Sequence, residues 1–143
     1  MIFVDANVLV ALFSVNHAFH SRAVDFMDAV MLQKEYLVIS PQVVGEVFVT
    51  VTSKRLFKNP ATPAHFRKQL GTLQSGGGIL TAAPGEKTVE FALIEAEKLG
   101  VASARIFDLL LYGTMREHGI KKLATFNVKH FAGLTDIEVV PIP

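Results

Sequence analysis

Three acidic residues of this chain lie in unusually apolar surroundings. Asp5 follows the apolar run at residues 2–4, Glu46 lies among valines beside a phenylalanine, and Asp108 lies among an isoleucine, a phenylalanine and three leucines. A carboxylate in such surroundings costs free energy unless it is paired, hydrogen-bonded or bound to a metal. Three carboxylates from separate elements suit an oxygen-preferring divalent cation, Mg²⁺ or Mn²⁺. We therefore take these three residues as candidate ligands of such a cation.

Each of these acids also has an ordinary structural interpretation. Asp5 could cap a helix that follows it. Glu46 continues a polar stripe that begins at Gln42, so it could lie on the solvated edge of a helix. Asp108 could form an ion pair with Arg105, one helical turn earlier. These alternatives stay open for each residue taken alone.

Short apolar runs alternate with helical segments along the chain. The predicted strands cover residues 2–4, 37–40, 79–82, 122–125 and 137–140. The predicted helices cover residues 8–12, 21–34, 42–55, 63–74, 86–99 and 104–118, the last with Ser103 as its cap, and a short helical turn follows Asn127. This alternation predicts an α/β fold, a three-layer α/β/α sandwich with a central, mostly parallel sheet in one domain spanning residues 1–143. Ligands of such folds bind beyond the carboxyl ends of the strands.

Composition excludes several classes of protein. The chain has 143 residues, half of them apolar, and contains no cysteine. Disulfide frameworks, thiolate metal sites and thiol nucleophiles are therefore excluded. No run reaches the roughly 18 to 20 apolar residues of a membrane span. We expect a cytoplasmic protein without a membrane partner.

The charges are balanced overall but unevenly distributed. Fourteen basic and thirteen acidic residues give a formal net charge of +1. No acidic residue occurs between Glu46 and Glu86, whereas that stretch contains five bases: Lys54, Arg55, Lys58, Arg67 and Lys68. These bases predict a flank that faces phosphates, although they could also be ordinary solvated side chains on two helix surfaces.

Several motifs, in order and spacing, resemble those of the PIN domain family. They are the run VDANVL at residues 4–9, the helix containing Glu46, the run IFD at residues 106–108, and the run LATFN at residues 123–127. The closest resemblance is to the VapC-type ribonuclease toxins of toxin–antitoxin pairs. The resemblance implies homodimerisation, a separate antitoxin protein as partner, and cleavage of RNA by an endoribonuclease that depends on Mg²⁺ or Mn²⁺.

The resemblance also assigns roles to individual residues. Asp5, Glu46 and Asp108 fall on the acidic positions that bind metal, and Asn7 falls on the polar position two residues after the first aspartate. We expect Asp5 and Asp108 to hold the cation directly, and Glu46 to act through water. Thr125 is expected to support the site. The metal would activate a water molecule for attack on the phosphodiester, leaving a 5′-phosphate and a 3′-hydroxyl.

The chain departs from the family pattern at the fourth corner of the site. Many members carry an aspartate two residues after the threonine, where this chain has Asn127. Others carry an aspartate three residues further on, where this chain has His130. The amide of Asn127 brings no charge, so the resemblance does not support a second metal ion. We keep Asn127 among the candidate catalytic residues. His130 is either a ligand or base, or an exposed residue of a helical turn.

Other basic residues are candidates for contact with the RNA backbone, and affinity should then fall as salt rises. Besides the five already named, they are Arg105 and Lys129. His17 and His20 have the i,i+3 spacing of a transition-metal pair, but we expect them to pack at the start of the second helix.

Two other functions compete with this interpretation. The run from Asp5 to Asn7 superficially resembles the start of a haloacid-dehalogenase-type phosphatase, in which a second aspartate two residues later is the general acid. Asn7 cannot exchange that proton, which disfavours this class. The second competitor is a PIN-like module that has lost catalysis but still binds RNA or an antitoxin.

Overall fold

Five strands form a single sheet in the computed structural model, which describes residues 1–143. The strands are β1 (Ile2–Val4), β2 (Leu37–Ile39), β3 (Ile79–Thr81), β4 (Lys122–Ala124) and β5 (Glu138–Val139). Their order in the sheet is β3-β2-β1-β4-β5, and all neighbouring pairs are parallel. The predicted parallel sheet is thereby confirmed, with each strand close to its predicted position.

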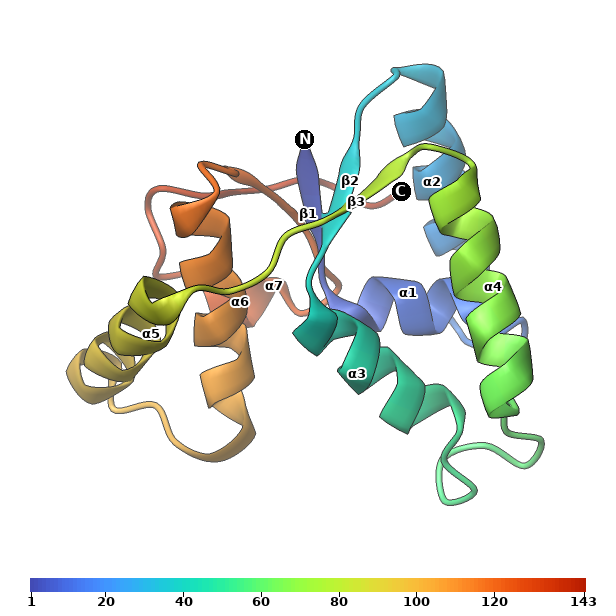
Figure 1. Cartoon of the computed structure of the whole chain (residues 1–143), viewed down its shortest axis with the longest axis horizontal. Helices are drawn as coiled ribbons and strands as arrows, with labels where there is room; N and C mark the ends of the chain where they lie inside the picture. The colour runs from blue at the N-terminus through green and yellow to red at the C-terminus, as the bar shows by residue number, and fades with distance from the viewer.

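Helices cover both faces of this sheet. They are α1 (Ala6–Phe13), α2 (His20–Leu32), α3 (Pro41–Val51), α4 (Pro63–Ser75), α5 (Glu86–Leu99), α6 (Ile106–Glu117) and α7 (Val128–Phe131), with a 3₁₀ turn at Ser103–Arg105 before α6. Figure 1 shows α2 and α4 on one side of the sheet and α5 and α6 on the other. The predicted three-layer α/β/α sandwich is therefore confirmed. No helix combines the length and the apolar character that crossing a bilayer requires.

The core lies where the central strands meet helices on both sides. All three residues of β1 and all three of β2 are buried. Val8 and Leu9 from α1, Val43 from α3 and Met115 from α6 pack into the same cluster of 26 buried apolar residues. Because parallel strands are covered on both faces, they appear in the sequence as unbroken apolar runs.

The third helix ends earlier than the sequence pattern predicts. It stops at Val51 instead of continuing to Arg55, and residues 52–62 form a connection to α4. The last turn is rich in β-branched residues, which favour helix weakly. The hydroxyls of Thr50 and Thr52 donate to backbone carbonyls four residues earlier, an arrangement that bends or ends helices. Lys54 and Arg55 consequently lie on a loop.

The sixth helix also begins differently from the prediction. Ser103 does not cap it, because this residue adopts a left-handed backbone conformation with φ of +58° and starts a 3₁₀ turn. The α-helix itself begins at Ile106, which places Asp108 in its first turn. The residues of the 3₁₀ turn therefore border the carboxyl edge of the sheet next to Asp108.

The order of the strands reverses at the centre of the sheet. The chain runs outward from β1 through β2 to β3, then returns to place β4 on the other side of β1. The register pairs Val4 with Ala124, and the amide of Asp5 donates to the carbonyl of Ala124. Such a reversal is where open parallel sheets bind ligands, because the connections diverge and leave a crevice.

Candidate active site

A pocket of about 510 Å³ opens at this reversal point, beyond the carboxyl ends of β1 and β4. The four predicted catalytic residues line it: Asp5 after β1, Glu46 on α3, Asp108 on α6 and Asn127 after β4. We call it the acidic pocket. It brings together side chains that are more than one hundred positions apart in the sequence.

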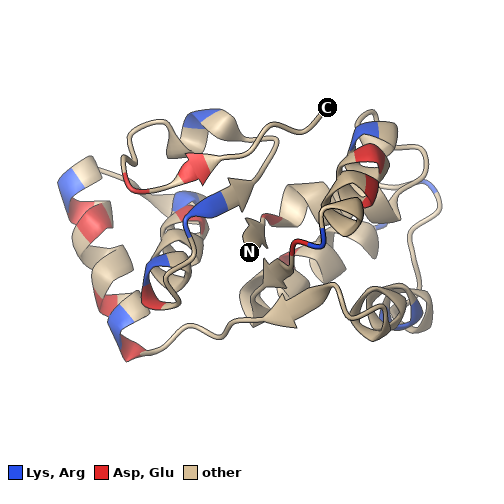
Figure 2. Ribbon diagram, turned by 90° about the horizontal axis from the view of Figure 1, so that it is seen from above, with Lys and Arg blue, Asp and Glu red and all other residues tan.

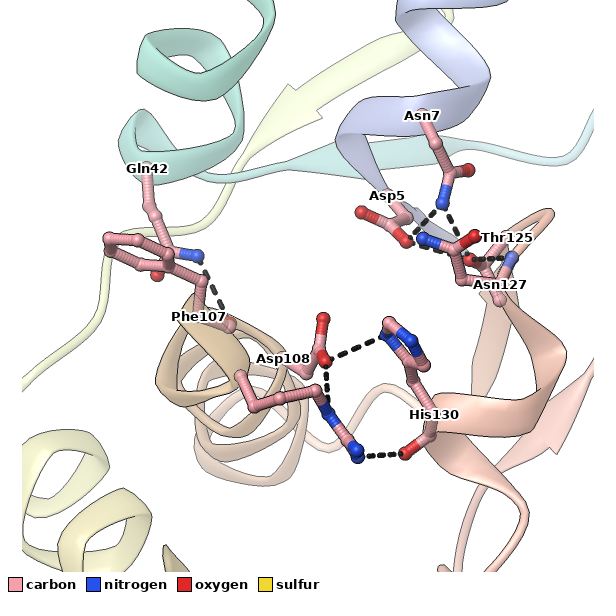
Figure 3. A network of polar contacts seen from close by, with 9 residues as sticks. Asp5, Asn7, Gln42, Phe107, Asp108, Thr125, Asn127 and His130 are labelled. Carbon is pink, nitrogen blue, oxygen red and sulfur yellow. Dashed lines mark hydrogen bonds and ion pairs between the residues drawn. The ribbon is translucent and has the colours of Figure 1, made fainter. Parts of the chain in front are cut away.

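Asp5 is held by two neutral donors. Its Oδ2 accepts a hydrogen bond from the Asn7 amide at 2.7 Å and from the Thr125 hydroxyl at 2.6 Å (Figure 3). The side-chain oxygen of Asn7 also accepts from the amide of Phe126 at 3.0 Å, which joins the ends of β1 and β4. Asp5 occupies the N-cap position of α1 but makes no capping hydrogen bond with its side chain. Asp5 therefore holds the position of a cap, whereas the hydrogen bonds described for its side chain come from Asn7 and Thr125.

Thr125 orders the loop that carries Asn127. Its hydroxyl oxygen accepts from the backbone amide of Asn127 at 2.9 Å and from the side-chain amide of Asn7 at 3.0 Å, while its proton goes to Asp5. Thr125 is buried, whereas Asn127 is exposed toward the pocket. Thr125 therefore positions both Asp5, which carries a charge, and the loop of Asn127, which does not.

Asp108 is bonded to two residues at the rim of the pocket. Its Oδ2 lies 3.0 Å from Arg105 Nε and 3.0 Å from His130 Nδ1. Arg105 also donates to the carbonyl of His130 at 3.2 Å, so the three residues form one cluster (Figure 3). The predicted ion pair between Asp108 and Arg105 is confirmed. His130 is exposed, and it also lines the acidic pocket.

Glu46 is held by a residue of its own helix. Gln42 donates to Glu46 Oε1 at 2.7 Å and to the carbonyl of Phe107 at 3.1 Å, which links α3 to α6. Thr50, one turn after Glu46, lines the same pocket. The polar stripe of α3 thus borders the acidic pocket.

The pKa values of Asp5 and Glu46 are both raised. Burial is the largest cause for Asp5, where the Thr125 hydrogen bond lowers the pKa and the negative charge of Asp108 raises it further. Burial likewise raises the pKa of Glu46, and repulsion from Asp5 and Asp108 adds to this effect despite the Gln42 hydrogen bond. The three acids therefore face a common space in which a cation would relieve their repulsion.

The donor set of the pocket fits an oxygen-preferring cation. It offers three carboxylates and one amide oxygen, the ligand types that Mg²⁺ and Mn²⁺ favour. No three histidine, aspartate or glutamate side chains of the chain lie close enough together to hold a metal ion as they stand. The role of Asp5, Glu46 and Asp108 as metal ligands stays a prediction.

A comparison with known protein families identifies the family of this chain. The PIN domain family profile matches residues 2–134, which is nearly the whole chain. The chain belongs to the PIN domain family. No curated protein sequence matches it. For this PIN domain, the predicted family and the predicted fold are therefore both confirmed.

Solved structures of similar fold include a toxin and a toxin–antitoxin complex. VapC20 of Mycobacterium tuberculosis, a toxin that cleaves the sarcin–ricin loop, has a TM-score of 0.72 and 18% identity, covering 99% of this chain and 100% of that one. A toxin–antitoxin complex from Klebsiella pneumoniae has a TM-score of 0.64 and 18% identity, covering 97% of each chain. VapBC2 from Rickettsia felis, bound to promoter DNA, has a TM-score of 0.65 and 18% identity, covering 96% of each chain. At this identity the likeness shows a shared PIN fold.

The basic residues that we expect to contact RNA divide into two groups. Arg105 lines the acidic pocket, whereas the others lie outside it on exposed positions of the α3–α4 connection, α4 and α7. Those outside are Lys54, Arg55, Lys58, Arg67, Lys68 and Lys129. Figure 2 shows bases without acids on α4, seen end-on at the lower right, whereas both signs alternate on α5 at the left. Contact with RNA stays a prediction for all of these residues.

The sequence does not assign Gln42 and His17 to the site. Gln42 was considered only as part of a polar stripe, although its i,i+4 spacing to Glu46 is the signal that places both on one helix face. His17 was expected only at the start of α2, and it lines the acidic pocket as well. His20 does lie at that helix start, where its ring contacts the carbonyl of Ala11.

Proposed function

We propose that this PIN domain is a metal-dependent endoribonuclease and the toxin of a toxin–antitoxin pair. The observation that carries the proposal is the acidic pocket at the reversal point of the sheet. Asp5, Glu46 and Asp108 line it, and burial together with the negative charge of Asp108 raises the pKa of Asp5 and of Glu46. Acidic side chains that repel one another beside a solvent-open crevice suit a cation and a phosphate.

Asp5 and Asp108 would hold the cation, and Glu46 would contact it through water. The bound cation would lower the pKa of a water molecule and stabilise negative charge on the phosphate. Mg²⁺ and Mn²⁺ both suit this set of oxygen donors. Because Asn127 is uncharged, the pocket supports one such cation more readily than two.

The side chains around these acids supply position and charge. Asn7 and Thr125 fix the orientation of Asp5, and Gln42 fixes that of Glu46. Glu46, with its raised pKa, would orient the attacking water and accept its proton. Water would attack the phosphorus, the bond to the 3′ oxygen would break, and that oxygen would take up a proton from solvent, which leaves a 5′-phosphate and a 3′-hydroxyl.

The proposed partners follow from the same set of relatives. Structures similar to this chain include complexes of a toxin with its antitoxin, so we propose a separate antitoxin protein and a homodimer of this chain. RNA is the proposed substrate. The exposed bases of the α3–α4 connection and α4 would contact its phosphates, which predicts binding that weakens as salt rises.

A cleavage assay with a matched pair of variants tests this function. The wild-type protein should cut single-stranded RNA in Mg²⁺ or Mn²⁺ and lose this activity in a chelator. D108N should be inactive, whereas D28N, which removes an exposed acid on α2, should keep full activity. Cleavage that survives the chelator, or full activity of D108N, would contradict the proposal.

One observation favours a second candidate, a module that binds RNA or an antitoxin without cleaving. Asp108 is already bonded to Arg105 and His130, and the fourth corner is the uncharged Asn127. Calorimetric titration with Mn²⁺ beside the cleavage assay separates the two candidates. Metal binding without cleavage of varied RNAs would establish the binding module.

A further inference from the structure

A second cleft, of about 830 Å³, adjoins the acidic pocket. Its walls are the α1–α2 connection at residues 14–19 and the α3–α4 connection at residues 52–62, which Figure 1 shows below α3 and α4. We call it the loop cleft; the residues that matter here are Phe13, Asn16, His17, Phe57, Asn59 and His65. His17 lines both this cleft and the acidic pocket, so the two spaces meet at its ring.

The loop cleft is suited to a polyanion. None of its lining residues is acidic, in contrast to the pocket beside it. The connection that forms one wall carries three exposed bases, Lys54, Arg55 and Lys58, and no acid. Two more bases, Arg67 and Lys68, are exposed on the helix that follows. A nucleic-acid backbone that leaves the acidic pocket past His17 would come close to these exposed basic side chains.

The lining of the cleft offers the groups that recognise an unpaired base. Aromatic rings provide flat surfaces on which bases stack, and the cleft contains Phe13, Phe57 and two histidines. Asn16 and Asn59, both exposed, carry amides that donate and accept, and so can read the edge of a base. The volume lies within the roughly 300–1,000 Å³ of pockets that hold small ligands.

The ring of His17 has a defined orientation at the junction. Its Nδ1 accepts a hydrogen bond from the amide of Phe19 at 3.1 Å. In the neutral ring the proton then lies on Nε2, which becomes a donor. The ring also packs against Phe19 with centroids 5.8 Å apart. A fixed donor between the two spaces is suited to a phosphate or sugar oxygen of a passing strand.

We propose that the loop cleft binds one unpaired nucleotide of the RNA, next to the phosphate that is cleaved, and thereby selects its base. This inference rests on the proposed function, because it places the scissile phosphate in the acidic pocket. A protein segment is a less suitable occupant, since the exposed bases around the cleft match a phosphate chain.

The test uses the double variant N16A/N59A, which changes two exposed side chains outside the acidic pocket. Its control is Q33A, an exposed amide that follows α2 at the opposite edge of the sheet. The first measurement sequences the ends produced from a pool of unstructured RNA with randomised bases. Wild type and Q33A should show a base preference at a fixed position beside the cut, and N16A/N59A should lose it while still cutting.

The second measurement needs no cleavage. Fluorescence anisotropy in a chelator gives the affinity of each protein for a labelled oligonucleotide and for a series of oligonucleotides that each carry one abasic site at a different position. Removing the base bound in the cleft should weaken binding to wild type and Q33A by about 10-fold, as expected for loss of one stacked base. Because N16A/N59A keeps the aromatic rings but loses both amides, the same removal should weaken its binding by less.

The outcomes separate the two proposals. Cleavage by N16A/N59A with an unchanged base preference would overturn the loop-cleft assignment and leave the nuclease proposal standing. Unchanged RNA affinity of this variant, together with lost binding of a co-expressed antitoxin, would assign the cleft to a protein and also overturn it. If wild type does not cleave under any metal, the proposed function fails, and the abasic comparison still decides the cleft.

Discussion

Carboxylates lie at both edges of the parallel sheet, but their partners differ. At the amino edge, Glu35 contacts two cations, the Met1 amine at 2.7 Å and Lys122 Nζ at 2.7 Å. At the carboxyl edge, Asp5 contacts neutral donors and faces the negative charge of Asp108. Each arrangement links β1 to β4 through side chains. Only at the amino edge do cations neutralise the charge of the carboxylate.

The pKa values move in opposite directions as a result. Hydrogen bonds from Lys122 and the N-terminal amine lower the pKa of Glu35 to about 2. Burial and the charge of Asp108 raise the pKa of Asp5, against the Thr125 hydrogen bond. One edge therefore uses charge to hold the fold together, whereas the other holds carboxyl groups together at a cost in stability, as the proposed cation site requires.

The largest difference between the edges should appear in RNA cleavage. D5N keeps an oxygen for Asn7 and Thr125 but removes the charge, and it should lower the cleavage rate at least 100-fold, since even outer partners of metal ligands matter about 10- to 100-fold. E35Q should leave the rate unchanged. Initial rates on one fluorescent RNA under saturating Mg²⁺ measure both. Equal losses in the two variants would remove the functional distinction between the edges.

A smaller effect should follow when a partner of each carboxylate is removed. N7A takes away a donor to Asp5 and the acceptor for the Phe126 amide, so it should reduce the cleavage rate and the Mn²⁺ affinity by about 10- to 100-fold. K122A, the counterpart at the amino edge, should alter neither. Calorimetric Mn²⁺ titration of both variants is the measurement. Wild-type Mn²⁺ affinity in N7A would show that Asn7 does not position Asp5.

Stability should change with pH in the direction that the raised pKa of Asp5 dictates. When a carboxyl group has a higher pKa in the folded state, the protein becomes less stable as pH rises from the unfolded pKa of that group, near 3.8, through its folded pKa. At pH 7 in a chelator, the free energy of unfolding of D5N should therefore exceed that of wild type by about 1 kcal/mol. Denaturant titration measures this difference. The gain should vanish below pH 3.8. D5N that is less stable than wild type at pH 7 would contradict this.

The opposite sign is expected at the amino edge. The lowered pKa of Glu35 contributes stability that is fully present above its unfolded pKa of 4.5 and is lost as pH falls toward about 2. E35Q should be the less stable protein at pH 7, by a modest amount because the pair is partly exposed. The two denaturation curves should converge near pH 2. A constant difference across the whole range would show that the ion pairs do not cause it.

The sequence contained enough to predict the sheet and the acids at its carboxyl edge. The buried strands are unbroken apolar runs, and Asp5 follows one of them directly. In the same way, Asp108 and Glu46 could be selected because a charge among apolar residues costs free energy unless it has a partner. Such signals are local, and parallel topology then brings distant residues to one edge.

Features that depend on loops could not be predicted in this way. The early end of α3 arises from threonine hydroxyls that bond back to the helix, and the left-handed backbone at Ser103 displaces the start of α6. The contact of His130 with Asp108 depends on how α7 packs beside the first turn of α6. The loop cleft depends on two connections that share no pattern in the sequence. Long-range packing, which propensity does not encode, determines all of these.

Anomalous diffraction from crystals soaked in Mn²⁺ would locate the proposed cation. We expect a peak in the acidic pocket within coordination distance, roughly 2.0–2.3 Å, of carboxylate oxygens of Asp5 and Asp108, with Glu46 joined to it directly or through one water. The same soak of D108N should show no peak there. A peak elsewhere on the chain, or none in the wild-type pocket at millimolar Mn²⁺, would contradict the account.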